Sequence, residues 1–233
     1  MKIEIWSDVV CPWCYIGKRR FERGLAAFAH RDDVEVVWRS FELDPHAPQD
    51  SREDPVDRLA RKYGMTREAA LAAQARVTGL AADEGLTYRL DLARPANTFD
   101  AHRLLHLAAE RAVQGSVKER LLAAYFTEGR PIGDAETLAT VAAEAGLDEA
   151  EARRVLDGDA FAAEVAGDER EAAALGISSV PFFVVDRRYG ISGAQPAELV
   201  QQVLERAWAD GHPMAAATTG ASEDVCADGS CPA

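Results

Sequence analysis

Two cysteines separated by two residues, Cys11 and Cys14, begin and end the sequence CPWC near the start of the chain. Such a pair can be part of a metal site, a disulfide that stabilises a fold, or a redox centre. A zinc knuckle lies in a turn between short strands and requires two further Cys or His ligands. The residues around CPWC instead predict a strand before the pair and a helix after it, which is typical of a redox centre.

The start of a helix suits this chemistry because its unpaired amides and partial positive charge stabilise a thiolate. Pro12 fits the first helical turn, where no hydrogen-bond donor is needed. Cys11, at the helix start, is expected to have a pKa well below the ordinary value of ~8.5. Cys14, one turn further, is expected to be more buried and to act as the resolving thiol.

The elements that must position the pair alternate between strand and helix. Residues 2–6 (KIEIW) alternate polar and apolar side chains and predict a strand, and residues 34–43 (VEVVWRSFEL) predict a second. The intervening segment places apolar residues on one helical face: Ile16, Phe21, Leu25 and Phe28. The order strand, helix, strand predicts a parallel pair of strands.

A long helical region separates this part from a second group of strands. After a loop over 44–55, the chain from about 57 to 175 is rich in Ala, Leu, Glu and Arg, which favour helices. Helix-end signals there are a capping box at Ser116 and Glu119, another at Asp148 and Glu151, an N-cap at Asp134 and a C-terminal glycine, Gly176. Runs 182–185 and 189–192 then predict a hairpin, and Pro196 opens a last helix.

Pro181 lies after a helix and directly before the strand FFVV. Given the CPWC sequence upstream, the Val180–Pro181 bond is expected to be cis, against the alternative of an ordinary trans proline at a strand start.

Composition excludes some classes of protein. The formal net charge of −13 over 233 residues disfavours nucleic-acid binding, and no apolar run is long enough for a membrane span. The first ten residues lack the pattern of a secretory signal, so a cytoplasmic location is expected. Four cysteines are too few for a disulfide scaffold.

Three stretches carry a family resemblance: WSDVVCPWCYIGKRRFE, NTFDAHRLLHLA and GISSVPFFVVDRRYGISGAQP. Over about residues 2–210 the chain resembles the FrnE-like branch of the DsbA family of thioredoxin-fold oxidoreductases. The resemblance implies an α/β thioredoxin-like fold with a large inserted α-helical domain. The expected division is a thioredoxin-like domain over 1–43 and 176–210, a helical domain over 44–175, and a flexible tail over 211–233.

The resemblance also implies thiol–disulfide oxidoreductase or isomerase activity on protein or peptide disulfides, without a cofactor or metal. Cys11 would be the nucleophile and Cys14 its resolving partner, with Pro181 beside them. A small thiol or a thioredoxin-type protein would be the redox partner. An alternative is a glutathione-dependent isomerase or transferase of the 2-hydroxychromene-2-carboxylate isomerase or kappa type, but those relatives carry serine in place of Cys11. A non-catalytic metal-binding or chaperone-like module is a third hypothesis.

Four further residues are expected to contact substrate: Trp13, Val180, Asn97 and His102. Trp13 should be exposed, whereas Asn97 or Thr98 could equally cap a helix. Asp8 could move protons near Cys14 or simply accept hydrogen bonds from backbone amides. His102 and His106 have the spacing of two zinc ligands, but no third ligand accompanies them.

The chain ends in a second cysteine pair, Cys226 and Cys231, in the sequence CADGSC. Some FrnE-like proteins have such a pair, which implies a second redox centre that exchanges with Cys11 and Cys14. The alternatives are an unstructured tail with two oxidisable thiols, or a zinc site made by all four cysteines.

Overall fold

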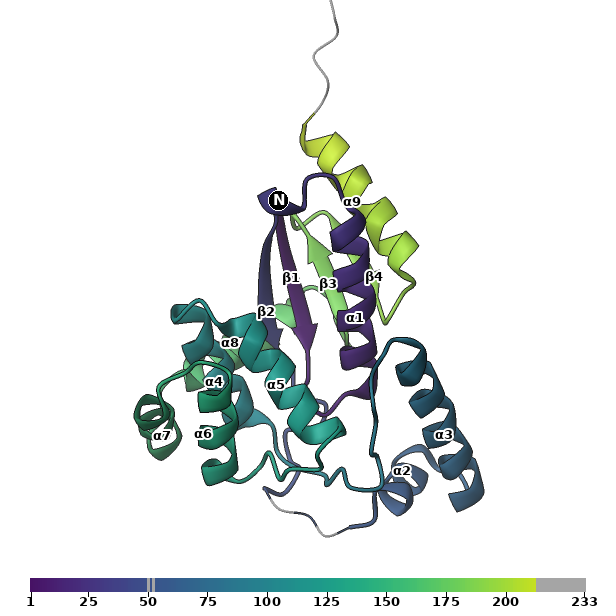
Figure 1. Ribbon diagram of the computed structural model, residues 1–233, viewed down its shortest axis with the longest axis vertical. Helices are drawn as coiled ribbons and strands as arrows, with labels where there is room; N and C mark the ends of the chain where they lie inside the picture. The colour runs from purple at the N-terminus through teal and green to yellow at the C-terminus, as the bar shows by residue number, and fades with distance from the viewer. Residues whose placement is uncertain (50, 52, 213–233) are drawn as a thin grey trace, which may run out of the picture.

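The structure of the protein is a computed structural model that describes residues 1–49, 51 and 53–212; the tail pair, Cys226 and Cys231, lies outside these residues. A mixed sheet with the order β2-β1-β3-β4 forms its centre (Figure 1). The four strands are β1 (Lys2–Ser7), β2 (Glu35–Ser40), β3 (Phe182–Val185) and β4 (Tyr189–Ser192). β1 and β2 are parallel, as predicted, and the other two pairings are antiparallel.

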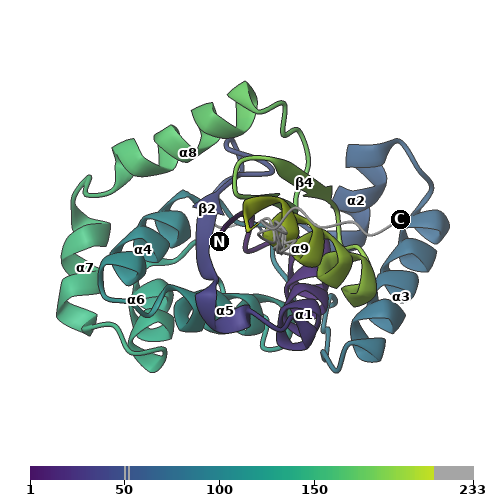
Figure 2. The same ribbon diagram turned by 90° about the horizontal axis from the view of Figure 1, so that it is seen from above.

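One face of the sheet is apolar and is covered by the first and last helices. Ile3 and Ile5 alternate with Glu4 and Trp6 along β1, so the two isoleucines share one face. α1 (Pro12–Ala27) and α9 (Ala197–Gly211) pack side by side over this face (Figures 1 and 2). Their shared core consists of buried residues from both helices and the sheet, including Phe21, Phe183, Val185, Val200 and Leu204.

Seven helices lie between β2 and β3 in the described chain, after the short 3-10 helix Arg31–Asp33 that precedes β2. They are α2 (Pro55–Tyr63), α3 (Arg67–Asp83), α4 (Phe99–Glu110), α5 (Gln114–Phe126), α6 (Ala135–Glu144), α7 (Glu149–Asp157) and α8 (Ala162–Ala174). Helices α4–α8 lie on one side of the sheet and the pair α2–α3 on the other (Figure 2). Their core includes Tyr15 and Ile16 of α1, so these helices pack against the end of α1 that carries the cysteines.

Ion pairs hold α1 between the two groups of helices. Glu119 of α5 accepts hydrogen bonds from Lys18, at 2.6 Å, and from Tyr15 of α1, at 2.7 Å. On the other side, Arg20 of α1 donates to Glu84, directly after α3, at 2.6 Å. The position of the helix start is therefore fixed from two directions.

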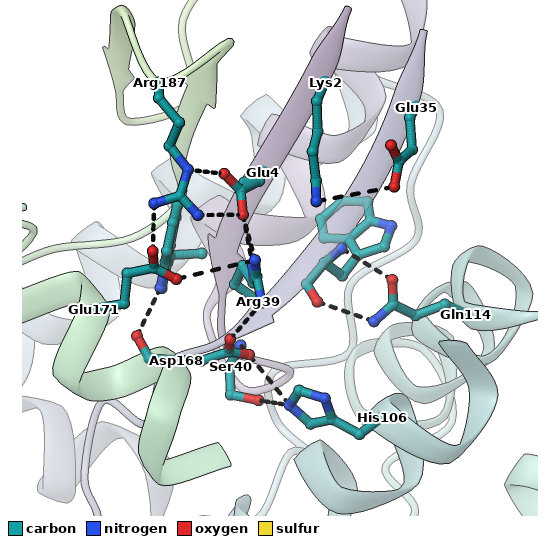
Figure 3. A network of polar contacts seen from close by, with 12 residues as sticks. Lys2, Glu4, Glu35, Arg39, Ser40, His106, Gln114, Asp168, Glu171 and Arg187 are labelled. Carbon is teal, nitrogen blue, oxygen red and sulfur yellow. Dashed lines mark hydrogen bonds and ion pairs between the residues drawn. The ribbon is translucent and has the colours of Figure 1, made fainter. Parts of the chain in front are cut away.

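The second face of the sheet carries a buried charge cluster that anchors α8 (Figure 3). Glu4 is 2% exposed and pairs with Arg39 of β2 and with Arg187 of the β3–β4 turn. Burial opposes its ionisation, but the two arginines outweigh burial and lower the pKa of Glu4. Arg39 also pairs with Asp168 of α8 at 2.9 Å, and Ala172 of α8 packs in one apolar cluster with Trp6, so charges and apolar contacts together join α8 to this face of the sheet.

Most predicted helix ends are confirmed, with one correction. Asp134 and Asp148 cap α6 and α7, and Gly176 has a positive φ of 73° after α8. The capping box at Ser116 is wrong, because α5 begins at Gln114 and its N-cap residue is Val113, three residues before Ser116. The Gln114 side chain exchanges two hydrogen bonds of 2.9 Å with the backbone of Trp38 in β2, and this tertiary contact fixes the helix start.

None of the helices in the described part of the chain is long and apolar enough to cross a membrane. The division into domains at residues 43, 175 and 210 stays a prediction.

Two glycines on helices provide a matched test of the α1–α9 contact. A Cβ at Gly24 of α1 would lie 2.7 Å from the Ala197 carbonyl oxygen, whereas a Cβ at Gly79 of α3 meets nothing within 4 Å. We expect Gly24→Ala to lower the free energy of unfolding by about 1–3 kcal/mol through overpacking. Gly79→Ala should raise it by up to ~1 kcal/mol through helix propensity. Urea unfolding of both variants measures this, and a stabilised Gly24→Ala would contradict the close packing.

Candidate active site at the start of α1

The first turn of α1 carries both cysteines of the CPWC sequence. Cys11 is the N-cap residue, with extended backbone angles of φ −88° and ψ 114°, and Pro12 occupies the first helical turn. The Cys14 amide donates to the Cys11 carbonyl oxygen at 3.0 Å, which closes this turn and brings the two thiols together. Both cysteines are free thiols, and we call them the dithiol.

The two cysteines of the dithiol differ in their access to solvent. Cys11 is 4% exposed and Cys14 is fully buried. Trp13, between them, is 41% exposed, as predicted, and presents an apolar ring at the surface beside Cys11. The turn is held from the other side by the Tyr88 hydroxyl, which donates to the Pro12 carbonyl oxygen at 2.6 Å. Of the two cysteines, only Cys11 keeps any exposed surface.

A segment far away in the sequence faces Cys11. The Cys11 sulfur lies 3.5 Å from the carbonyl oxygen of Val180, and the Val180–Pro181 peptide bond is cis. Gly17 of α1 makes room for this loop, because a Cβ there would lie 2.8 Å from Cγ of Pro181. The structure therefore brings together the three residues that the sequence assigned to the centre of the site: Cys11, Cys14 and Pro181.

Beneath the dithiol lies a buried group of polar side chains. Asp8 is fully buried and accepts a hydrogen bond from the Leu43 amide at 2.8 Å. Its other oxygen lies 3.4 Å from Nε2 of His102, on α4. Lys118, on α5, is also fully buried, and its Nζ donates to the Ser7 carbonyl oxygen at 3.2 Å. One carboxyl group and one amine thus accompany the two thiols.

These neighbours set the protonation of the buried carboxyl and amine. Burial would raise the pKa of Asp8, but the hydrogen bonds from His102 and Leu43 and the charge of Lys118 outweigh it and lower the pKa. Burial lowers the pKa of Lys118 to about 8, although the charges of Cys14 and Asp8 favour its protonated form. Near neutral pH the site therefore contains a carboxylate and an ammonium group.

The order of acidity within the dithiol corrects the prediction that Cys11 has the lowered pKa. The hydrogen bond with Cys14, together with burial, raises the pKa of Cys11 well above its ordinary value. Burial also opposes ionisation of Cys14, but the hydrogen bond from Cys11 and the charge of Lys118 outweigh it and lower the pKa. The two thiols share a hydrogen bond, so the first proton is lost from the pair as a unit.

His102 and Asn97 were both expected to contact substrate, but one is buried and the other is partly exposed. His102 is fully buried against Asp8, so the prediction that it lines the substrate groove is wrong. Its helix turns this side chain inward, towards the carboxylate. Asn97 is partly exposed and caps α4, because its side-chain oxygen accepts from the Phe99 amide at 2.9 Å. A substrate contact for Asn97 stays a prediction, as it does for Trp13 and Val180.

The two histidines of α4 have separate carboxylate partners. His106 lies 3.1 Å from Asp168, whereas His102 faces Asp8. Among the described residues, no group of three or more His, Cys, Asp or Glu side chains is placed to hold a metal ion.

Lys118 and Glu42 belong to the site but were not found from the sequence. Lys118 is followed by Glu119 and Arg120, a run of charges that is typical of a helix surface. Glu42 lies between Phe41 and Leu43, which pack against the cluster that contains Cys11 and Cys14. Only the packing of α5 and of the segment after β2 reveals these positions.

Comparisons with known proteins agree with this geometry. Residues 2–205 match the family of the DSBA-like thioredoxin domain. The chain belongs to this family. It is 32% identical to the uncharacterised protein YwbO of Bacillus subtilis over 157 residues, which is 66% of this chain and 71% of YwbO.

Solved structures extend the comparison to the fold. A probable DsbA oxidoreductase from Streptomyces coelicolor is 51% identical, with a TM-score of 0.86 over 90% of this chain and 91% of the other. The cytosolic disulfide reductase DsbM from Pseudomonas aeruginosa, solved with GSH, is 18% identical, with a TM-score of 0.64 over 89% of this chain and 99% of the other. The predicted α/β thioredoxin-like fold of the DsbA family is confirmed.

Unequal access predicts unequal alkylation of the dithiol. With limiting iodoacetamide at about neutral pH, we expect Cys11 to be modified at least ~10-fold faster than Cys14, because a thiol must be reached as well as ionised to react. Peptide mass spectrometry separates the two sites. The preference should vanish in denaturant, and equal labelling of the folded protein would contradict the burial of Cys14.

Glu42 predicts a stability change with pH. Burial, with the charges of Glu169, Asp8 and Asp100, raises the pKa of Glu42 to about 7. The folded protein therefore holds a proton that the unfolded chain releases near pH ~4.3, so stability is lost as pH rises from ~4.3 to about 7. Glu42→Gln removes this loss.

For this variant we expect a gain in the free energy of unfolding of about 1 kcal/mol near pH ~8, a value already reduced because Glu42 is only partly buried, and no gain near pH ~4. Urea unfolding at the two pH values measures the difference. An equal gain at both would show that the carboxylate charge is not its cause.

Proposed function

We propose that this protein is a thiol–disulfide oxidoreductase that acts on protein or peptide disulfides through Cys11 and Cys14. The observation that carries the proposal is the position of Cys11. Cys11 keeps 4% of its surface exposed whereas Cys14 is fully buried, and the Cys11 sulfur lies 3.5 Å from the Val180 carbonyl oxygen, at the start of a helix. Membership of the DSBA-like thioredoxin domain family supports the same chemistry.

The first chemical step is attack by Cys11 on a substrate disulfide. The shared proton moves across the hydrogen bond from the Cys11 sulfur to the Cys14 sulfur, which leaves a thiolate on Cys11. This thiolate forms a bond to one substrate sulfur, the substrate S–S bond breaks, and the other substrate sulfur leaves as a thiolate. Because the pair shares one proton, the unfavourable pKa of Cys11 does not prevent the attack.

The second step resolves the mixed disulfide. Cys14 loses its proton, its thiolate attacks the Cys11 sulfur, and the second substrate sulfur leaves. The substrate is reduced by two electrons and the dithiol becomes the Cys11–Cys14 disulfide. A small thiol or a thioredoxin-type protein would return the two electrons; the complex of DsbM with GSH, a distant structural relative, is compatible with a small thiol.

Substrate contacts follow from what surrounds Cys11. The exposed Trp13 ring offers an apolar surface to an unfolded segment. No hydrogen bond within the described residues uses the Val180 amide, so an extended substrate chain can pair with it as an added strand would. Asn97 lies further out, next to Glu42. A FrnE-like assignment and a cytoplasmic location belong to the same proposal.

An assay of insulin reduction by dithiothreitol tests the function. We expect the wild type to accelerate precipitation of the insulin B chain and Cys11→Ser to lose at least ~100-fold of this rate, because the attacking sulfur is gone. A variant with serine at both Cys226 and Cys231 is the control for the tail pair. A Cys11→Ser variant as active as the wild type would contradict the proposal and favour a binding module. Glutathione-dependent isomerisation without disulfide exchange would favour the isomerase alternative.

A further inference from the structure

Tyr88 lies in the irregular segment between α3 and α4 and reaches the turn that carries the dithiol. The residue is 6% exposed, and its hydroxyl donates to the Pro12 carbonyl oxygen at 2.6 Å. This carbonyl belongs to the peptide group that joins Pro12 to Trp13, so it lies in the backbone between the two cysteines. Among the described residues, no other side chain forms a hydrogen bond with the backbone of residues 11–14.

The segment around Tyr88 is fixed on the end of α5. The Thr127 hydroxyl donates to the Thr87 carbonyl oxygen at 2.8 Å, and the Arg89 amide donates to the Phe126 carbonyl oxygen at 2.7 Å. These two hydrogen bonds hold the residues on either side of Tyr88. The Tyr88 ring also stacks on the Phe126 ring, with 4.7 Å between the ring centres and 21° between the planes. The end of α5 therefore sets the position of the hydroxyl.

The hydrogen bond to Pro12 is an addition to those that a helix needs. In an α-helix a carbonyl in the first turn accepts from the amide four residues later, and its second lone pair needs no partner. Tyr125, whose ring contacts the same Phe126 ring at 4.8 Å, is 7% exposed, and its hydroxyl forms no hydrogen bond within the described part of the chain. The contact between Tyr88 and Pro12 is therefore a specific feature of the turn.

We infer that Tyr88 is a positioning residue for the second step of exchange, in which the Cys14 sulfur attacks the Cys11 sulfur of a mixed disulfide. The inference rests on the proposed function and adds to it a residue that speeds the release of substrate. In the first step the substrate can adjust its own position to Cys11. In the second step the attacking, attacked and leaving sulfurs must lie in line, and the turn between the cysteines sets this geometry. A loosened turn should therefore slow the second step more than the first.

Oxidised glutathione is a suitable probe because each step changes the mass of the chain. In the first step the Cys11 thiolate bonds to one glutathione sulfur, and the other glutathione leaves as a thiolate and takes the proton released by the dithiol. In the second step the Cys14 thiolate bonds to the Cys11 sulfur, and the second glutathione leaves and takes the Cys14 proton. The dithiol is oxidised by two electrons, and oxidised glutathione is reduced to two glutathione molecules.

The experiment mixes the reduced full chain with oxidised glutathione, quenches samples with acid and measures their masses. Every variant also carries Cys226→Ser and Cys231→Ser, so that only the dithiol reacts. Tyr88→Phe removes the hydroxyl and keeps the ring, and we expect it to lengthen the lifetime of the mixed disulfide at least ~10-fold while its rate of formation changes less than ~2-fold. The matched control, Tyr125→Phe, removes a hydroxyl beside the same Phe126 ring and should change neither rate more than ~2-fold.

A second variant tests the same arrangement without a change at Tyr88. Thr127→Val removes the hydrogen bond to Thr87 at nearly constant side-chain size, and it should lengthen the lifetime of the mixed disulfide ~2–5-fold. Because Thr127 acts on the turn through the Tyr88 hydroxyl, the substitution should have no further effect in the Tyr88→Phe variant. Two substitutions that merely loosen the fold would instead multiply their effects. Circular dichroism checks that each variant is folded.

The outcomes separate this inference from the proposed function. An unchanged lifetime of the mixed disulfide in Tyr88→Phe, or equal slowing of both steps, would overturn the inference and leave the proposed function intact. Multiplied effects of Tyr88→Phe and Thr127→Val would overturn it as well. If a chain with the tyrosines and Thr127 intact forms no glutathione adduct at Cys11, the proposed function is contradicted, and the step that Tyr88 is inferred to assist is lost with it.

Discussion

Much of the site follows from the requirement that a dithiol be buried and still be reached at one of its two cysteines. Cys14 has no exposed surface, and Cys11 keeps only 4% of its surface exposed beside the Val180–Pro181 loop. A buried pair of thiols cannot lose protons easily, because burial disfavours thiolates. The surrounding structure compensates with a helix start, a shared hydrogen bond and a buried cation. Access and acidity are thereby divided between the two cysteines.

The helices between β2 and β3 do more than enlarge the protein. They carry His102 and Lys118 into the interior beneath the dithiol, and Glu119 holds α1 in place through Lys18. On the other face of the sheet, Asp168 joins α8 to β2 through a charge cluster (Figure 3). The orientation of these helices therefore affects the electrostatics of the site directly.

The sequence was informative where local chemistry decides the structure. The alternation in β1, the position of Pro12 and the glycine after α8 each predict an element end or a strand from neighbouring residues alone. The CPWC sequence placed the dithiol on the correct helix. The predicted start of α5 was wrong because Gln114 forms hydrogen bonds with Trp38 of β2, which lies 76 residues away in the sequence.

The buried group of polar side chains beneath the dithiol could not be predicted for a similar reason. Lys118 has charged neighbours in the sequence and becomes buried only when α5 packs beside β1 and β2. The predicted lowering of the Cys11 pKa was wrong because the prediction considered the helix start without burial and without the second thiol. His102 was placed in a groove because its helix lies near the site, but its side chain points to Asp8. These properties depend on tertiary contacts, which have no local sequence signal.

The central claim is that substrate disulfides are attacked by Cys11 and released by Cys14. It is tested most directly by mass spectrometry of Cys14→Ser and Cys11→Ser variants mixed with a peptide disulfide, both made with serine at Cys226 and Cys231. The account predicts that Cys14→Ser accumulates one peptide per chain as a mixed disulfide at Cys11, because the resolving thiol is absent, while Cys11→Ser accumulates little. Equal trapping by both variants, or trapping at Cys14 alone, would contradict it.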